Sequence, residues 1–331
     1  MTSTLATIGA LWVAWISFAL ATSLIITFAY PAAAGWLRKA HPRPRAALAR
    51  AAALAPSIVP TLLLLACLAP SMGGAFGRQG DHCLHHADHL HLCLIHRTGA
   101  LDAPLGTALL FGSVALAFML ARSSAKLGQS RRTADALRSL AQPDSVGGLR
   151  VLNSATPFCF ATGHSGGAGG EIWISSALSE GLSQAELDVV LAHEHAHLDR
   201  RDAGWRVAAE FLSFPLFPGL RRVILEDEAL AAEQACDEAA GLRVGDRLRV
   251  AETLLAVERL SGASASSSPP GWPAFGGSSV ATRVRSLLAE PPPDRSWTAA
   301  SGLGAALVGG SLLLFSDSLH HWTEHWLRMV L

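Results

Sequence analysis

Two histidines and a glutamate near the middle of the chain have the spacing of a metal-dependent hydrolase site. Residues 193–197 read HEHAH, with His193 and His197 at the outer positions and Glu194 directly after the first histidine. On a helix, residues four apart lie on one face, so both imidazoles can reach one zinc ion. Glu194 then points to one side, where it can act as general base without binding the metal. The motif predicts zinc-dependent hydrolysis.

A pair of acidic residues four apart supplies the missing ligand. Glu233 and Asp237 share a face of a helix that we expect at about 222–240, with Gly241 as its stop. Glu233 is the expected third ligand, which leaves the fourth position of a tetrahedral site open. Asp237 is expected to hydrogen-bond the free ring nitrogen of a ligating histidine and to fix its tautomer. The alternative is a solvated acidic face; the upstream motif favours the metal site.

The elements around the motif predict an α+β domain. Ser183 and Glu186 form a capping-box pattern, so the motif helix should begin there. Charged residues at 199–202 argue that this helix lies outside lipid. Strands are expected at 150–152, 157–161 and 171–175. A substrate peptide could add as a strand beside residues 171–175.

The composition predicts a membrane protein. Of 331 residues, 50% are hydrophobic and only 16% are charged, and the mean hydropathy is +0.32; these values are too apolar for an ordinary soluble enzyme. Four apolar segments, at about 5–33, 51–72, 103–121 and 298–316, are long enough to cross a bilayer. The basic residues at 36–50, which we interpret as a loop, and at 122–138 should be cytoplasmic. The N-terminus should therefore lie outside.

These observations divide the chain into three parts. Residues 1–122 form a membrane region with three transmembrane helices and an external loop at 73–100. Residues 123–297 form a soluble, cytoplasmic, zincin-like (gluzincin) metalloprotease domain with a flexible linker at 261–279. Residues 298–331 form the fourth transmembrane helix and a short external tail. We expect the lipid bilayer and a protein substrate as partners. Because the net charge is zero, no direct nucleic-acid binding is expected.

The external loop is rich in histidine and cysteine. Six of its residues could form a second metal site for copper or zinc; they are His82, Cys83, His86, His89, Cys93 and His96. A smaller histidine group follows in the external tail, at His320, His321 and His325. The alternative is a Cys83–Cys93 disulfide with merely exposed histidines.

The HEHAH motif followed by Glu-x-Ala-Cys-Asp at 233–237, between a third and a fourth apolar segment, resembles the BlaR/MecR-type integral-membrane zinc metallopeptidases. Residues 173–202 and 283–288 also resemble the pattern of that family. The resemblance implies a protease of the bacterial cytoplasmic membrane that is activated by an external signal and leads to cleavage of a cytoplasmic, winged-helix transcriptional repressor. The sequence shows no penicillin-binding sensor domain, so we expect a short form in which metal ions are a candidate signal.

Three other functions compete with this interpretation. A quality-control protease of the HtpX/Ste type would share the zinc motif and the downstream glutamate. A non-catalytic metal sensor would keep the site without activity. A metal transporter would use the histidine-rich loop, but the four apolar segments have no ionisable residue near their centres. A homodimer is compatible with all of these.

Overall fold

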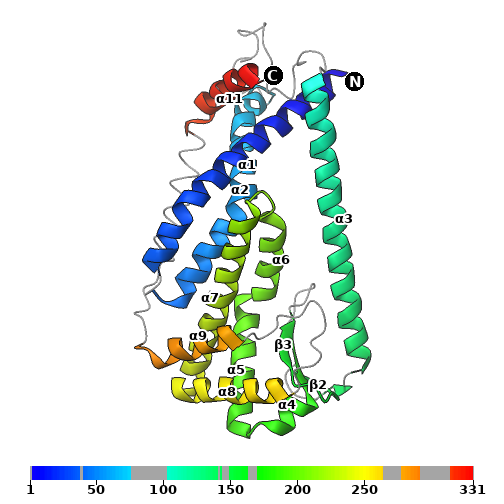
Figure 1. The fold of residues 1–331 in the computed structure, drawn as a ribbon. Helices are drawn as coiled ribbons and strands as arrows, with labels where there is room; N and C mark the ends of the chain where they lie inside the picture. The colour runs from blue at the N-terminus through cyan, green and yellow to red at the C-terminus, as the bar shows by residue number, and fades with distance from the viewer. Residues whose placement is uncertain are drawn as a thin grey trace.

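Three long apolar helices dominate the upper part of the molecule in the computed structural model (Figure 1). The structure describes residues 2–37, 40–75, 103–140, 142–143, 149–162, 170–263, 277–290 and 314–330. Helices α1 (Thr2–Trp36), α2 (Pro42–Ala75) and α3 (Ala103–Leu140) contain the first three predicted spans. Within the described residues, segments long and apolar enough to cross a membrane are Leu5–Trp36, Pro42–Ala69 and Ala103–Arg122. These helices support the prediction of a membrane protein.

Two predicted features fall outside the described residues. Almost all of the fourth span at 298–316 lies there, and the next described helix is α11 (Ser316–Val330). The external loop with its six candidate ligands also lies there, except for residues 73–75. Both stay predictions.

Small residues allow the membrane helices to approach closely. Ala6, Ala10 and Ala14 of α1 form one buried cluster with Cys67 of α2 and Leu105 of α3. A Cβ added at Gly9 would lie 2.7 Å from the carbonyl oxygen of Leu105, so a larger residue would push α1 and α3 apart. Helix α11 packs across the upper end of α2 (Figure 1).

The predicted basic loop at 36–50 is mostly helix. Helix α2 begins at Pro42, so Arg43, Arg45 and Arg50 are helical residues. Proline suits the first turn of a helix because it has no backbone N–H to satisfy. The His41 Nδ1 also accepts a hydrogen bond from the Arg43 backbone N–H, at 3.2 Å. The alanine-rich sequence that follows favours helix, and the loop is correspondingly shorter than predicted.

A small mixed sheet precedes the motif helix. Its strands are β1 (Gln142–Pro143), β2 (Leu149–Leu152), β3 (Cys159–Thr162) and β4 (Glu171–Ser175), in the order β1-β2-β4-β3. The three predicted strands are confirmed, the second with a shift toward its C-terminal side. The prediction that a substrate strand adds beside residues 171–175 is wrong, because β4 is parallel to β2 on one side and antiparallel to β3 on the other. Among the described strands, β3 is the outer neighbour of β4.

Six further helices lie in the described residues between 176 and 288. They are α4 (Ser176–Gly181), α5 (Gln184–Arg200), α6 (Asp202–Leu212), α7 (Pro218–Val244), α8 (Arg247–Ala263) and α9 (Gly277–Leu288). The predicted stop at Gly241 is wrong, because Gly241 is a helical residue of α7. The helix ends at Gly245, whose φ of 74° is easily adopted only by glycine. Of the predicted linker at 261–279, residues 264–276 lie outside the described part.

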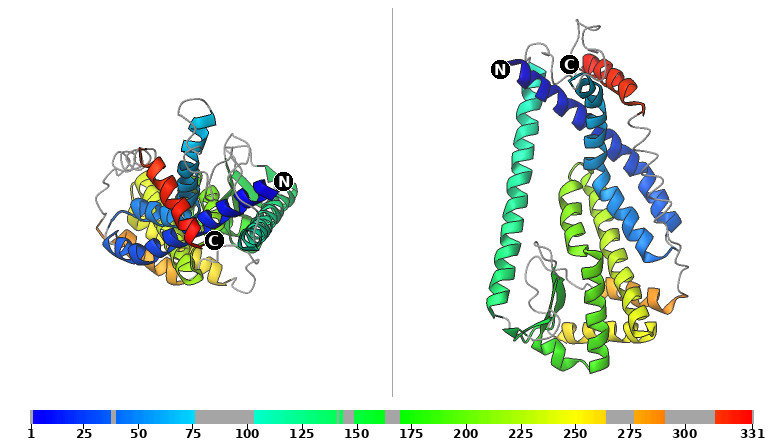
Figure 2. Two further views of the ribbon diagram at one scale, coloured as in Figure 1. Left: turned by 90° about the horizontal axis from the view of Figure 1, so that it is seen from above. Right: turned by 180° about the vertical axis from the view of Figure 1, so that it is seen from behind.

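Helices α6 and α7 form a hairpin that rises beside α1 and α2 (Figures 1 and 2). Ala209 and Leu216 of the hairpin share one buried cluster with Ile26 of α1 and Ala53 of α2. The cytoplasmic domain expected at 123–297 stays a prediction, and its α6–α7 hairpin packs against helices of the expected membrane region. Helix α3 runs through the expected boundary at residue 122 without a break, because the sequence that follows is rich in the helix-favouring residues Ala, Leu and Arg.

Candidate metal centre

The motif helix α5 begins where the capping box predicts. The Ser183 side chain accepts the backbone N–H of Glu186, and the Glu186 carboxylate accepts the backbone N–H of Ser183 at 2.8 Å. The helix ends at Arg201, whose φ of 55° turns the chain directly into α6. The start and the end of α5 thus place His193 and His197 at its C-terminal half.

The three predicted ligands converge on one point. The Nε2 atoms of His193 and His197 lie 3.1 Å apart. The Glu233 carboxylate reaches across from α7, at 3.4 Å from His193 Nε2 and 3.6 Å from His197 Nε2. Together these atoms lie within 4.8 Å of one another. Two imidazole nitrogens and one carboxylate are a donor set that suits zinc, and the Oε2 atom of Glu233 is buried without a hydrogen bond. The residues present therefore fit a zinc ion.

Each histidine has a carboxylate behind its second nitrogen. Asp237 Oδ1 lies 3.0 Å from His193 Nδ1, at the place expected for it. Asp202 Oδ2, at the start of α6, lies 2.8 Å from His197 Nδ1. Such carboxylates hold the ring so that Nε2 faces the metal, and they raise its basicity. Asp202 was missed because the charged residues at 199–202 were used only as evidence against lipid; the signal was an acidic residue five positions after His197.

A buried arginine from α9 forms ion pairs with the two carboxylates that α7 contributes to the site. Arg283 is 1% exposed and donates to both oxygens of Asp237, at 2.8 and 2.6 Å. Its Nη1 also lies 3.2 Å from Glu233 Oε2. Burial alone would raise the pKa of Glu233, but contacts with the two histidines and the charge of Arg283 hold that pKa well below its usual range. The pKa of Asp237 is lowered as well: burial acts to raise it, but the charge of Arg283 prevails. Glu233 and Asp237 are therefore both anionic, as a metal ligand and the carboxylate that orients a ligating histidine must be. The only sequence signal for Arg283 was its place in the 283–288 segment.

Glu194 lies beside the ligands without joining them. It is buried on the side of α5 that packs against β3. Burial raises the pKa of Glu194, an effect that the neighbouring histidines oppose. His195 contacts the carbonyl oxygen of Leu191 on its own helix, at 2.7 Å, and stays outside the cluster. The side of α5 that carries Glu194 therefore faces the outer strand of the sheet.

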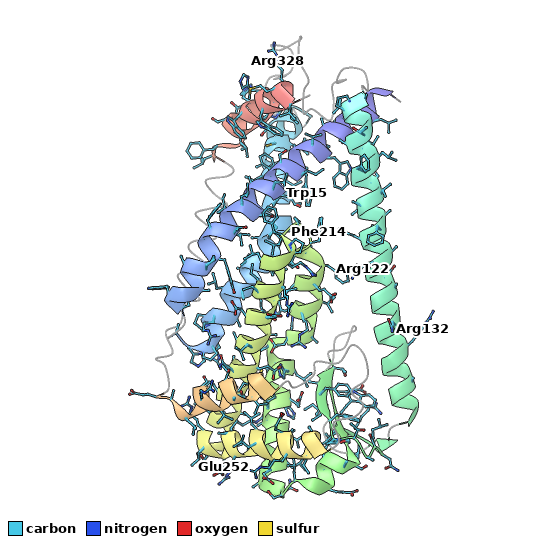
Figure 3. The ribbon with its side chains drawn as sticks, viewed as in Figure 1. Trp15, Arg122, Arg132, Phe214, Glu252 and Arg328 are labelled. Atoms are coloured by element: carbon cyan, nitrogen blue, oxygen red, sulfur yellow. The ribbon has the colours of Figure 1, made fainter. Side chains whose placement is uncertain are left out.

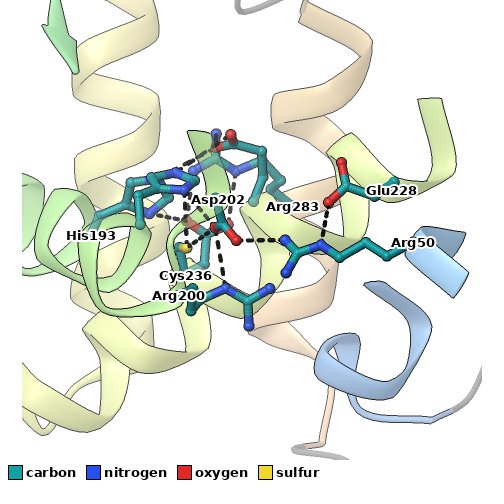
Figure 4. A network of polar contacts seen from close by, with 10 residues as sticks. Arg50, His193, Arg200, Asp202, Glu228, Cys236 and Arg283 are labelled. Atoms are coloured by element: carbon teal, nitrogen blue, oxygen red, sulfur yellow. Dashed lines mark hydrogen bonds and ion pairs between the residues drawn. The ribbon is translucent and has the colours of Figure 1, made fainter. Parts of the chain in front are cut away.

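A chain of polar contacts continues from His197 to the membrane helices (Figure 4). Arg50 of α2 lies between Asp202, at 2.5 Å, and Glu228 of α7, at 2.7 Å. The free thiol of Cys236 lies 3.4 Å from His197 Nδ1 and 3.5 Å from Asp202. Cys236 is buried at this position.

The tail histidines do not gather around one point. His320 is buried against α2, with Nδ1 2.7 Å from the Cys67 carbonyl oxygen and Nε2 3.0 Å from Glu324. His321 is more exposed. Within the described residues, the groups of converging metal-ligating atoms are both at the α5–α7 site.

A helix-borne HEHAH motif, a glutamate that approaches it from a later helix and three apolar helices are the features of a membrane-associated metallopeptidase. Residues 130–264 match the model of peptidase family M48, a family of zinc-dependent peptidases. The matched segment contains every proposed ligand together with Glu194, Asp202 and Asp237. No curated protein and no solved structure matches the chain. This match and the N-terminal apolar helices together support a membrane-associated metallopeptidase.

Proposed function

We propose that this chain is a zinc-dependent endopeptidase of the bacterial cytoplasmic membrane, with its catalytic segment on the cytoplasmic side. The observation that carries the proposal is the convergence of His193, His197 and Glu233 within 4.8 Å, with Glu194 beside them. A zinc ion held there would activate a water molecule and polarise the scissile carbonyl.

The proposed proton transfers belong to Glu194. As general base it removes a proton from the attacking water, and it then returns that proton to the leaving amine. Its burial keeps the proton affinity of the carboxylate above that of a solvated glutamate. Asp202 and Asp237 orient the two imidazoles, and Arg283 balances the charges of Asp237 and Glu233.

Strand β3 is the proposed platform for the substrate. Strand β3 packs against α5, the helix that carries Glu194, so a peptide paired with β3 would pass close to the general base. Strand addition supplies main-chain hydrogen bonds irrespective of side chains. A cytoplasmic protein with an extended segment could be held in this way.

The biological role that we propose is signal transduction, in which cleavage inactivates a cytoplasmic transcriptional repressor after an external stimulus. The support is the order of the motifs between apolar segments, together with the contacts that link membrane helix α2 to Asp202. The quality-control role is the second candidate, because a family M48 domain is compatible with either substrate class.

The test is the Glu194→Gln variant, which should keep zinc and lose peptide hydrolysis by about 10²-fold or more. Zinc content by elemental analysis and cleavage of a casein-like substrate are measured on the purified protein, with His195→Gln as the control on the same helix. Full activity of Glu194→Gln would refute the assignment. Proteomes of cells with each form then separate the roles: accumulation of one repressor supports signalling, whereas accumulation of many membrane proteins supports quality control.

A further inference from the structure

The turn between α6 and α7 is an apolar segment on the outside of the structure. Residues 211–220 read FLSFPLFPGL and contain no charge. Phe214 and Phe217 are each 42% exposed, and Val207 and Val223 on the flanking helices are each 48% exposed. A soluble domain rarely leaves so many large apolar side chains together in water.

The contacts of this turn place it deep along the membrane helices. Ser57 of α2 donates to the Leu212 carbonyl, and Ser57 lies seven residues, or about 10 Å, beyond Arg50, the last charge of α2. Trp15 of α1 stacks on Phe214, with ring centroids 5.8 Å apart (Figure 3). Since the hydrocarbon core is about 30 Å thick, the turn reaches well into it.

The backbone of the turn is satisfied without water. Ser23 of α1 donates to the Pro215 carbonyl at 3.0 Å, as Ser57 does to Leu212. Arg221 donates a hydrogen bond to the Glu210 carbonyl oxygen at 2.8 Å. The Leu216 backbone N–H donates to the Ser213 carbonyl oxygen at 3.1 Å. Prolines at 215 and 218 have no N–H to satisfy. Irregular backbone at membrane depth requires such pairing within the protein.

We propose that the α6–α7 turn is a re-entrant segment whose outer face lies against the acyl chains of the bilayer. The inner face packs on α1 and α2, and lipid covers Phe217, Val207 and Val223. Trp205 agrees with this placement: its ring lies 5.9 Å from the Arg50 guanidinium, at the level where tryptophan gathers in membrane interfaces.

The placement also restricts the substrate. Because Arg50 contacts Asp202, the metal centre lies at the level where α2 enters the membrane. The scissile bond would then lie close to the cytoplasmic membrane surface, so segments tethered there would be favoured. This consequence rests on the proposed peptidase function, whereas the lipid contact does not.

The test uses single-cysteine substitutions that carry an environment-sensitive fluorophore. Phe217→Cys and Val223→Cys probe the tip and a position about 9 Å lower on α7. Leu242→Cys, on the same helix and 76% exposed, is the matched control. The full-length protein is placed in phosphatidylcholine–phosphatidylglycerol vesicles, and the labelled unsubstituted protein supplies the background of native cysteines.

Nitroxide groups on lipid acyl chains should quench the label at 217 several-fold more than the label at 242, with 223 between them. Aqueous iodide should give the reverse order. The proposal is overturned if iodide reaches 217 as readily as 242. It is also overturned if both quenchers fail at 217 and shielding rises with protein density, because a second copy would then cover the turn. Val207→Cys on α6 gives the same comparison if Phe217→Cys does not fold.

Discussion

Arg50 of the second apolar helix forms an ion pair with Asp202, at 2.5 Å between Nη2 and Oδ1, and the other oxygen of Asp202 contacts His197. A residue of a candidate membrane helix is thus two contacts away from a proposed zinc ligand. The same guanidinium holds Glu228 of α7 at 2.7 Å. Any displacement of α2 along this contact would therefore change how the ring of His197 is held.

Replacing Arg50 by alanine should weaken zinc binding by about 10-fold to 100-fold, because Asp202 loses the partner that fixes it. Lysine should restore only part of the affinity, since it lacks the fork that reaches both carboxylates. Competition with a zinc chelator measures the effect. Arg222→Ala, which removes an exposed pair with Glu226, should leave affinity unchanged; equal losses in both variants would contradict the link.

Replacing Arg283 by alanine should destabilise the catalytic segment by about 3–5 kcal/mol, because Asp237 and Glu233 would remain buried without their countercharge. Thermal unfolding in detergent provides the measurement. Arg285→Ala removes an exposed arginine of the same helix and should stay within about 0.5 kcal/mol of the unsubstituted protein. A similar small change for Arg283 would mean that the two carboxylates do not depend on it.

Replacing Ser183 by alanine should cost about 1 kcal/mol, because the first turn of α5 loses its cap. The Ser183 hydroxyl and the Ser183 backbone N–H both lower the pKa of Glu186, and the substitution removes only the hydroxyl. Thermal unfolding at neutral pH tests this. The zinc affinity should not change, since the cap lies more than two turns from His193; a large loss of zinc would contradict a purely local role.

The stability of α11 should depend on pH through His320. Burial acts against the charged ring, but the Glu324 carboxylate prevails and raises the pKa of His320 above its value of 6.5. A group whose pKa is raised on folding stabilises the folded state fully below about pH 6.5 and loses this contribution as pH rises through the folded pKa. The unfolding temperature of the protein should therefore exceed that of His320→Gln most at low pH. A difference that stays constant from pH 6 to 9 would exclude this linkage.

Local patterns carried much of the prediction. The capping box located the start of α5, and spacing of four residues placed His193 with His197 and Glu233 with Asp237 on shared helix faces. Apolar length located the three described candidate spans. These features depend on hydrogen bonds and side-chain periodicity within a few turns, so a single sequence is enough to recognise them.

Long-range contacts were decided only by tertiary structure. The run of charges at 199–202 does not indicate that Asp202 faces His197. No local pattern predicts that Arg50 pairs with Asp202, 152 residues away, or that Arg283 pairs with Asp237, 46 residues away. The sheet order, which closes both sides of β4, and the packing of the α6–α7 turn on α1 and α2 have the same origin. The sequence by itself thus determined which residues could bind a metal. Helix packing determined which residues support those ligands and how close to the membrane they lie. The reason is that these contacts join segments that share no local pattern.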